Sequence, residues 1–213
     1  MSKETRTSKS VKNAQIALLF YLLNLILQFY SRKIFLNYLG SEVLGLNTTA
    51  QNLINFLNLA ELGIGAAVSY SLYKPLLDNN KNVINDIISI QGWLYRKIAY
   101  IVIISGIILM SFFPLIFSKT DLPLWYTYGS FISLSVAALL SYFVNYNQII
   151  LSADQKEYKI TRCTQITKII KVILQIIAIY YLKNGYLWWM IIEVLMSIIT
   201  AYTIDYTVKK NYP

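Results

Sequence analysis

The stretch Gly45–Asp78, GLNTTAQNLINFLNLAELGIGAAVSYSLYKPLLD, decides the fold class. It is apolar and longer than the about 20 residues that a helix needs to cross a bilayer. Its first half nevertheless carries polar and acidic side chains: Gln51, Asn52, Asn55, Asn58 and Glu61. Hydrocarbon offers such groups no hydrogen-bond partner, so they must face other protein or a water-filled cavity. At about 100° per residue, one helical face carries Gln51, Asn55, Asn58, Gly65 and Ser69, with Glu61 at its edge. We therefore expect one continuous membrane helix over 47–73 that lines a wet interior.

The composition indicates a membrane protein. The chain has 213 residues, of which 56% are hydrophobic and only 14% charged, whereas a soluble domain has about 25% charged residues. It has no His and a single Cys, Cys163, which excludes histidine-based catalysis, histidine metal sites and a disulfide within the chain. The net charge of +9 comes from basic residues dispersed between apolar segments, so we do not expect a nucleic-acid partner.

We expect an all-α integral membrane domain of six transmembrane helices over residues 14–208. The predicted spans are 14–36, 47–73, 93–113, 126–151, 160–182 and 187–208. Residues 1–13 form a basic tail that lacks the apolar core of a secretory signal, and residues 209–213 form a basic end. Residues 82–91 are predicted as an interfacial or helix-extending segment, and the third span as a helix that faces lipid.

The Lys and Arg residues predict the orientation of these spans. With a cytoplasmic amino terminus, thirteen of the nineteen fall on the inner side: Lys3, Arg6, Lys9, Lys12, Lys74, Lys81, Arg96, Lys97, Lys156, Lys159, Arg162, Lys209 and Lys210. Four fall outside, namely Arg32, Lys33, Lys119 and Lys183, and Lys168 and Lys171 fall within a span. Because cytoplasmic loops carry an excess of Lys and Arg, we expect both termini in the cytoplasm.

The second span and its flanks, residues 38–80, resemble the corresponding region of bacterial polysaccharide transport proteins, the oligosaccharide flippases. The resemblance is carried by Ser31–Gly40 (SRKIFLNYLG), Leu44–Asn47 (LGLN), Ala60–Gly65 (AELGIG) and Leu72–Leu76 (LYKPL). Elsewhere the chain is similar to this family only in hydropathy and loop spacing. The family belongs to the superfamily of multidrug extruders and the lipid II flippase.

The resemblance implies one lobe of a two-lobe transporter in the bacterial inner membrane, with a central cavity between the lobes. Because family members have twelve to fourteen spans, the chain is expected to be an amino-terminal half whose second lobe is missing. The implied function is translocation of undecaprenyl-pyrophosphate-linked oligosaccharide repeats, for O-antigen, capsule or exopolysaccharide, by alternating access. The expected partners are the lipid-linked oligosaccharide, membrane lipids, a second lobe of six to eight spans and polysaccharide assembly enzymes, and no cofactor is expected.

This function requires side chains that replace water around a glycan and a pyrophosphate. The candidates for lining the cavity are Asn24, Gln28, Arg32, Gln51, Asn55, Asn58, Lys168, Lys171 and Gln175. Lys168 and Lys171 are the phosphate candidates, since charge-assisted bonds to anions are strong and Lys168 lies about 12 Å of helical rise beyond Ile160. Snorkelling is the alternative for the lysines, interfacial anchoring for Arg32, and helix-to-helix hydrogen bonding for the amides. Glu61 and Glu193 are the candidates for coupling transport to an ion.

Three other functions compete with this prediction. A membrane glycosyltransferase or polymerase needs an acidic pair or a basic catalytic loop outside the bilayer, and the predicted outer loops are too short for one, so an enzyme is not expected. A multidrug cation antiporter of the same superfamily prefers an acidic cavity, whereas this chain offers Lys168 and Lys171 along with Glu61. A non-transporting six-span assembly partner is the third alternative.

Overall fold

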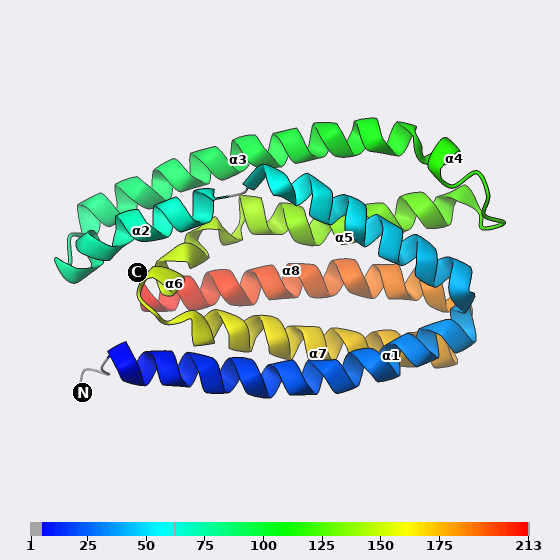
Figure 1. Ribbon diagram of the computed structural model, residues 1–213, viewed down its shortest axis with the longest axis horizontal. Helices are drawn as coiled ribbons and strands as arrows, with labels where there is room; N and C mark the ends of the chain where they lie inside the picture. Colours follow the sequence, from blue (N-terminus) through cyan, green and yellow to red (C-terminus); the bar gives the residue numbers. More distant parts are fainter. Residues whose placement is uncertain (1–5, 62, 213) are drawn as a thin grey trace.

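The computed structural model describes residues 6–61 and 63–212 as a bundle of lengthwise-packed helices (Figure 1), and no strand occurs in these two ranges. The elements are α1 (Arg6–Leu57), η1 (Asn58–Glu61), α2 (Ile64–Leu77), α3 (Lys81–Ser111), α4 (Phe113–Ile116), α5 (Leu124–Phe143), η2 (Asn145–Gln148), α6 (Ile149–Ala153), α7 (Glu157–Tyr181) and α8 (Gly185–Asn211). Within the described ranges, five helices are long and apolar enough to cross a membrane: α1 from Asn13 onward, α3, α5, α7 and α8. This confirms the prediction of an all-α membrane protein.

Helix α1 consists of two arms joined at Gly40. The backbone there has φ 84° and ψ 170°, outside the helical region, and glycine is the residue that tolerates such a conformation. The chain reverses direction at this point, so the arm over 41–57 runs back toward the end of the bundle where α1 began (Figure 1). The boundary between the first two predicted spans therefore falls at Gly40.

The second predicted span, 47–73, is not one continuous helix, which corrects the sequence-based expectation. The first helical segment ends at Leu57, a 3-10 turn follows over Asn58–Glu61, and α2 begins after Gly63, which has φ 87°. The interruption occurs where polar side chains reach partners on other helices. The Tyr142 hydroxyl donates to Asn58 Oδ1 at 3.1 Å, and the Tyr95 hydroxyl donates to Glu61 Oε1. The predicted single polar face therefore does not form.

The fourth predicted span, 126–151, is also interrupted. Helix α5 ends at Phe143, and the run Asn145–Gln148 (NYNQ) forms the 3-10 turn η2 before α6. Asparagine favours turns over helix interiors because its side chain competes for backbone hydrogen bonds. The interruption places Asn145 in the interior, where only 5% of its surface is exposed.

The segment 82–91 belongs to α3, which confirms the helix-extending alternative. The expectation that the third span faces lipid is wrong for one side of the helix. Tyr95, Ile98, Ala99 and Val102 are buried, and with Tyr142 of α5 they form an apolar cluster. The opposite side of α3 exposes apolar residues such as Ile101, Ile104 and Ile108.

Helices α7 and α8 form a tight antiparallel hairpin at the centre of the bundle (Figure 1). The turn contains Asn184 with φ 59°, and Gly185 lies so close to α7 that a Cβ atom there would stand 2.8 Å from Ile179 Cα. Helices α1 and α5 contact this hairpin through aromatic rings. Phe35 of α1 lies edge-on to Tyr186 and Trp189, and Tyr126 of α5 stacks on Tyr186. The tight turn thereby fixes which residues of α7 lie opposite which residues of α8.

Both ends of the described chain lie at the same end of the bundle, together with the turn between α2 and α3 (Figure 1). The loop after α6 is anchored there by Asp154, which pairs with Lys156 Nζ at 2.5 Å and accepts from the Tyr212 hydroxyl at 2.6 Å. Burial and the bond to Asp154 raise the pKa of Tyr212. We call this the terminal end of the bundle.

Candidate functional site

An ion pair between α7 and α8 lies in the interior of the bundle. Lys171 has fourteen residues of α7 before it and ten after it, which places it near mid-helix. Its Nζ stands 2.6 Å from Glu193 Oε1, and Gln175 Nε2 donates to Glu193 Oε2 at 2.9 Å. Glu193 is only 4% exposed. A buried carboxylate is tolerated when both of its oxygens are bonded, and Lys171 and Gln175 meet that requirement.

Lys171 and Lys168 line a cavity of about 180 Å³ between α5, α7 and α8, which we call the lysine cavity. Its walls are joined by a hydrogen bond from Thr200 Oγ1 to Thr167 Oγ1 at 2.9 Å. Lys168 is half-buried and has neither an ion-pair nor a hydrogen-bond partner among the residues that the structure describes. The lysine cavity therefore contains one cation that is balanced and one that is not.

A second polar cavity, of about 290 Å³, lies between η1, α3 and η2, and we call it the Glu61 cavity. Its lining includes Glu61, Gln91, Tyr95, Asn145, Tyr146 and Gln148. The Tyr95 hydroxyl donates to Glu61 Oε1. Gly65 faces this pair, because a Cβ atom at that position would lie 3.4 Å from the Tyr95 hydroxyl. The hydrogen bond from Tyr95 thus holds the Glu61 side chain against α3, in the wall of the Glu61 cavity.

Asn145 lines both cavities, so they adjoin, and together they form what we call the polar chamber. Asn145 Oδ1 and Gln91 Oε1 are buried without a hydrogen-bond partner in the described part of the chain. A buried acceptor that stays unbonded costs about 1–3 kcal/mol, and each cavity far exceeds the about 15 Å³ that one water needs. The chamber can therefore accept water or the hydroxyl groups of a ligand.

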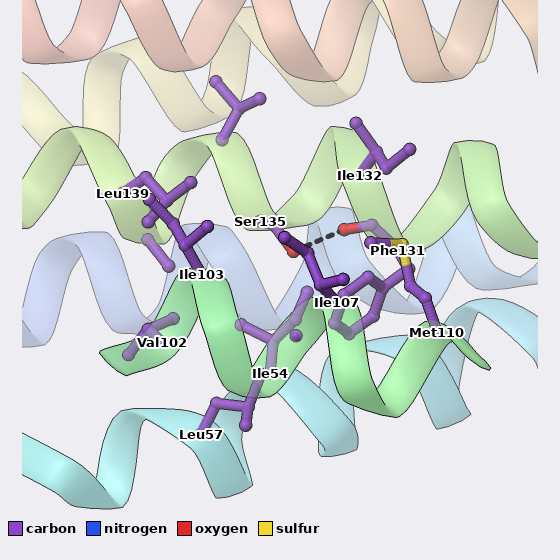
Figure 2. Close-up of a pocket in the computed structure, with 13 residues that line it drawn as sticks. Ile54, Leu57, Val102, Ile103, Ile107, Met110, Phe131, Ile132, Ser135 and Leu139 are labelled. Atoms are coloured by element: carbon purple, nitrogen blue, oxygen red, sulfur yellow. Dashed lines mark hydrogen bonds between the residues drawn. The ribbon is translucent and has the colours of Figure 1, made fainter. Parts of the chain in front are cut away.

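A cavity of about 160 Å³ between α1, α3 and α5 has a different character (Figure 2). Its lining is hydrocarbon, including Ile54, Ile103 and Phe131. Its one hydroxyl, on Ser135, donates to Phe131 O of the same helix at 2.7 Å. This cavity offers no free hydrogen-bonding group among the residues drawn, so it is not the candidate site for a polar ligand.

The predicted site residues divide into two groups. The structure brings Lys168, Lys171, Gln175 and Glu193 together at the lysine cavity and places Glu61 in the Glu61 cavity. Asn58 is half-buried nearby and accepts the Tyr142 hydroxyl. Of the remaining candidates, Asn24 is buried against α7, where its Nδ2 donates to Gln165 Oε1 at 2.6 Å. Asn24 thus makes the helix-to-helix hydrogen bond that was the alternative to lining the cavity.

The other four candidates lie outside the chamber. Gln28 and Arg32 are exposed on α1. Gln51 and Asn55 are exposed on its second arm, where Gln51 Nε2 donates to Asn55 Oδ1 at 3.2 Å. Of the three candidates on the first arm of α1, Asn24, Gln28 and Arg32, only Asn24 therefore turns inward, where it contacts α7.

Sequence analysis missed Gln91 and Tyr95 of α3. Both are buried and line the Glu61 cavity. The available signal was their spacing of four residues, which puts an amide and a hydroxyl on one helical face at the point where the third span was taken to begin. Asn145 was not among the predicted site residues, and the structure leaves its side-chain oxygen unbonded between the two cavities.

These features define an all-α, multi-pass membrane protein whose interior contains a polar chamber with one internally neutralised ion pair. Comparison with protein-family models, with curated proteins and with solved structures finds no match to this chain.

Proposed function

We propose that this chain is one lobe of a flippase that moves undecaprenyl-pyrophosphate-linked oligosaccharides across the bacterial inner membrane by alternating access. The observation that carries the proposal is Lys168. It lies half-buried on the wall of the lysine cavity without a counter-ion among the described residues, while the neighbouring Lys171 is neutralised by Glu193. An ammonium group within a membrane is costly unless an anion reaches it. A pyrophosphate would supply that anion through charge-assisted hydrogen bonds.

The rest of the polar chamber suits a glycan. Sugar hydroxyls are donors, and the unbonded oxygens of Asn145 and Gln91 are acceptors in the walls. A head group that crosses the membrane must exchange its bonds to water for bonds to protein. The prenyl tail can remain in the lipid, so the chamber need enclose only the polar part of the ligand.

The course of the chain supports six crossings. The proposed crossings are the two arms of α1, the second continued by α2, followed by α3, α5 with α6, α7 and α8, all of which lie along the length of the bundle (Figure 1). The terminal end carries the basic residues of the α2–α3 turn, the α6–α7 loop and the end of α8: Lys74, Lys81, Lys156, Lys159, Lys209 and Lys210. The opposite end carries Lys119 and Lys183, and Arg32 and Lys33 lie on the first arm of α1 about two turns before Gly40. This asymmetry favours a cytoplasmic position for the terminal end and both termini.

The two carboxylates proposed for ion coupling are bonded within the protein, which supports an anionic over a cationic ligand at the lysine cavity, whereas Glu157 of the Glu61 cavity is exposed. A multidrug cation antiporter needs a carboxylate that is free to meet its substrate. Glu193 is bonded by Lys171 and Gln175, and Glu61 by Tyr95. Protonation of either carboxylate would weaken these bonds, so Glu61 and Glu193 remain our candidates for ion coupling.

Complementation tests the proposal. In a bacterial strain that lacks its oligosaccharide flippase, we would express the chain alone and together with the reading frame that follows Pro213, and measure surface polysaccharide at matched protein level. Lys168→Gln should lower surface polysaccharide about tenfold, since a hydrogen bond to a charged group contributes about 1.5–3 kcal/mol. Lys168→Arg should retain most of it, because the charge remains.

Lys81→Gln is the matched control, because it removes an exposed lysine at the terminal end and should leave surface polysaccharide unchanged. Normal polysaccharide in the Lys168→Gln strain, at normal protein level, would remove the anion role of Lys168. Resistance to cationic drugs without any rescue of polysaccharide would instead identify an antiporter. No rescue and no resistance with the extended reading frame would leave the assembly-partner alternative.

A further inference from the structure

Helices α7 and α8 leave an open groove at the terminal end, which shares Thr167 with the lysine cavity. The groove has a volume of about 400 Å³, and its lining includes Lys159, Arg162, Cys163, Ile166, Thr203 and Thr207. The basic residues lie nearest the start of α7, and Ile166 lies four residues, or about 6 Å of rise, deeper than Arg162. The groove therefore runs from a charged mouth into an apolar interior.

The hydroxyl groups in the groove do not call for a polar ligand. Thr203 Oγ1 donates to Thr200 O at 2.9 Å, and Thr207 Oγ1 donates to Thr203 O at 2.7 Å. Cys163 Sγ lies 3.3 Å from Thr207 Oγ1 and is half-buried. Because these polar atoms are already bonded, the inner part of the groove suits hydrocarbon.

The mouth of the groove carries positive charge that nearby carboxylates do not balance. On α8, Lys210 follows Thr203 and Thr207 on the same helical face, seven and three residues further along. Lys210 and Arg162 are exposed and have no carboxylate partner in the described ranges. The neighbouring acids are engaged elsewhere, because Asp205 pairs with Lys209 at 2.6 Å and Asp154 with Lys156 at 2.5 Å. Glu157, in the first turn of α7, is exposed.

We propose that this groove binds one anionic phospholipid, with its phosphate between Arg162 and Lys210 and an acyl chain along Cys163 and Ile166. Basic pockets between membrane helices at a cytoplasmic face are suited to acidic head groups, and the guanidinium of Arg162 matches the geometry of a phosphate. A free phosphate would occupy the mouth alone, whereas the phospholipid also covers the apolar length. The proposed phosphate and acyl-chain contacts, Arg162, Lys210, Cys163 and Ile166, do not line the polar chamber, and the proposal does not depend on the proposed transport function.

Cys163 provides a reporter for this site, since it is the only thiol in the chain. We would reconstitute the full chain in phosphatidylcholine nanodiscs with and without phosphatidylglycerol and measure the rate of alkylation by N-ethylmaleimide. Phosphatidylglycerol should slow alkylation about fivefold, the factor that about 1 kcal/mol of protection represents. Native mass spectrometry should detect one retained phosphatidylglycerol per chain.

The double variant Arg162→Gln/Lys210→Gln should weaken phosphatidylglycerol binding about 25-fold, because each basic residue near an anionic membrane contributes about 1 kcal/mol. The matched control Lys74→Gln/Lys81→Gln removes two exposed basic residues at the same end, from α2 and α3, and should bind as the unchanged chain does. Ile166→Trp keeps the charges and fills the groove, and it should also reduce binding.

Three results would overturn the proposal. One is alkylation of Cys163 at equal rates in the two lipids. Another is equal slowing by inorganic phosphate in pure phosphatidylcholine, which would indicate a phosphate site without a lipid chain. The third is an equal loss of binding in the groove variant and the control, which would indicate attraction to the membrane surface as a whole.

Discussion

The ion pair at the lysine cavity leads to an asymmetric prediction for stability. Removing one partner of a fully buried pair costs about 3–5 kcal/mol, because the other charge is stranded. The two partners differ in exposure, with 24% of the Lys171 side chain exposed but only 6% of that of Glu193. Lys171→Met strands the less exposed charge and should therefore cost about 3–4 kcal/mol. Glu193→Gln should cost about 1–2 kcal/mol, since Lys171 can still extend into the cavity.

The double variant Lys171→Met/Glu193→Gln removes both charges and strands neither. Its free energy of unfolding should be lower than that of the unchanged chain by about 1–2 kcal/mol, so the coupling energy between the two positions should be about 2–5 kcal/mol. The free energies can be measured by reversible unfolding of the detergent-solubilised chain with increasing sodium dodecyl sulfate.

Two outcomes would refute this reasoning about the pair. The first is additivity of the two single changes to within about 0.5 kcal/mol, the limit expected for independent sites. The second is a smaller loss in the free energy of unfolding for Lys171→Met than for Glu193→Gln. In that case the exposed fraction of the remaining charged side chain would not determine how well the protein tolerates it. The exposed pair Asp205 and Lys209, one helical turn apart, is the control, and the corresponding coupling should be about 0.3–0.5 kcal/mol.

Three further changes test the fold and the Glu61 cavity. Gly40→Ala should lower the free energy of unfolding by about 1–3 kcal/mol, because alanine is strained at φ 84°; an unchanged thermal midpoint in detergent would contradict the reversal at Gly40. Gly185→Ala places a methyl group 2.8 Å from Ile179 Cα and should lower the free energy of unfolding by about 1–3 kcal/mol. The thermal midpoint should then fall by about 2–4 °C for each kcal/mol lost. Tyr95→Phe removes the donor to Glu61 and should cost about 1–3 kcal/mol. The same change in a chain that already carries Glu61→Leu should cost clearly less, and an equal cost in both chains would show that the bond does not contribute.

The sequence predicted the all-α membrane class because hydropathy and helix length are local properties. Spans five and six were placed within a few residues of α7 and α8, since their charged boundaries and the Lys183–Tyr186 turn are explicit in the sequence. The interruptions at Asn58–Glu61 and Asn145–Gln148 were missed. The first depends on partners supplied by other helices, because the tyrosines that bond Asn58 and Glu61 lie far away in the sequence. The second combines the turn preference of asparagine with a bond from Asn147 Nδ2 to Asp205 of α8.

The chamber was predictable only in part, for the same reason. Lys168, Lys171 and Gln175 recur at helical spacing, so the sequence by itself determined that one face of the fifth span is polar. Only the tertiary structure decided that Glu193 neutralises Lys171 and not Lys168, that Gln91 and Asn145 turn inward, and that Gln28 and Arg32 do not. Periodicity states which residues share a face of one helix, but a face becomes an interior only when another helix packs against it, and that depends on the shapes and contacts of the whole bundle.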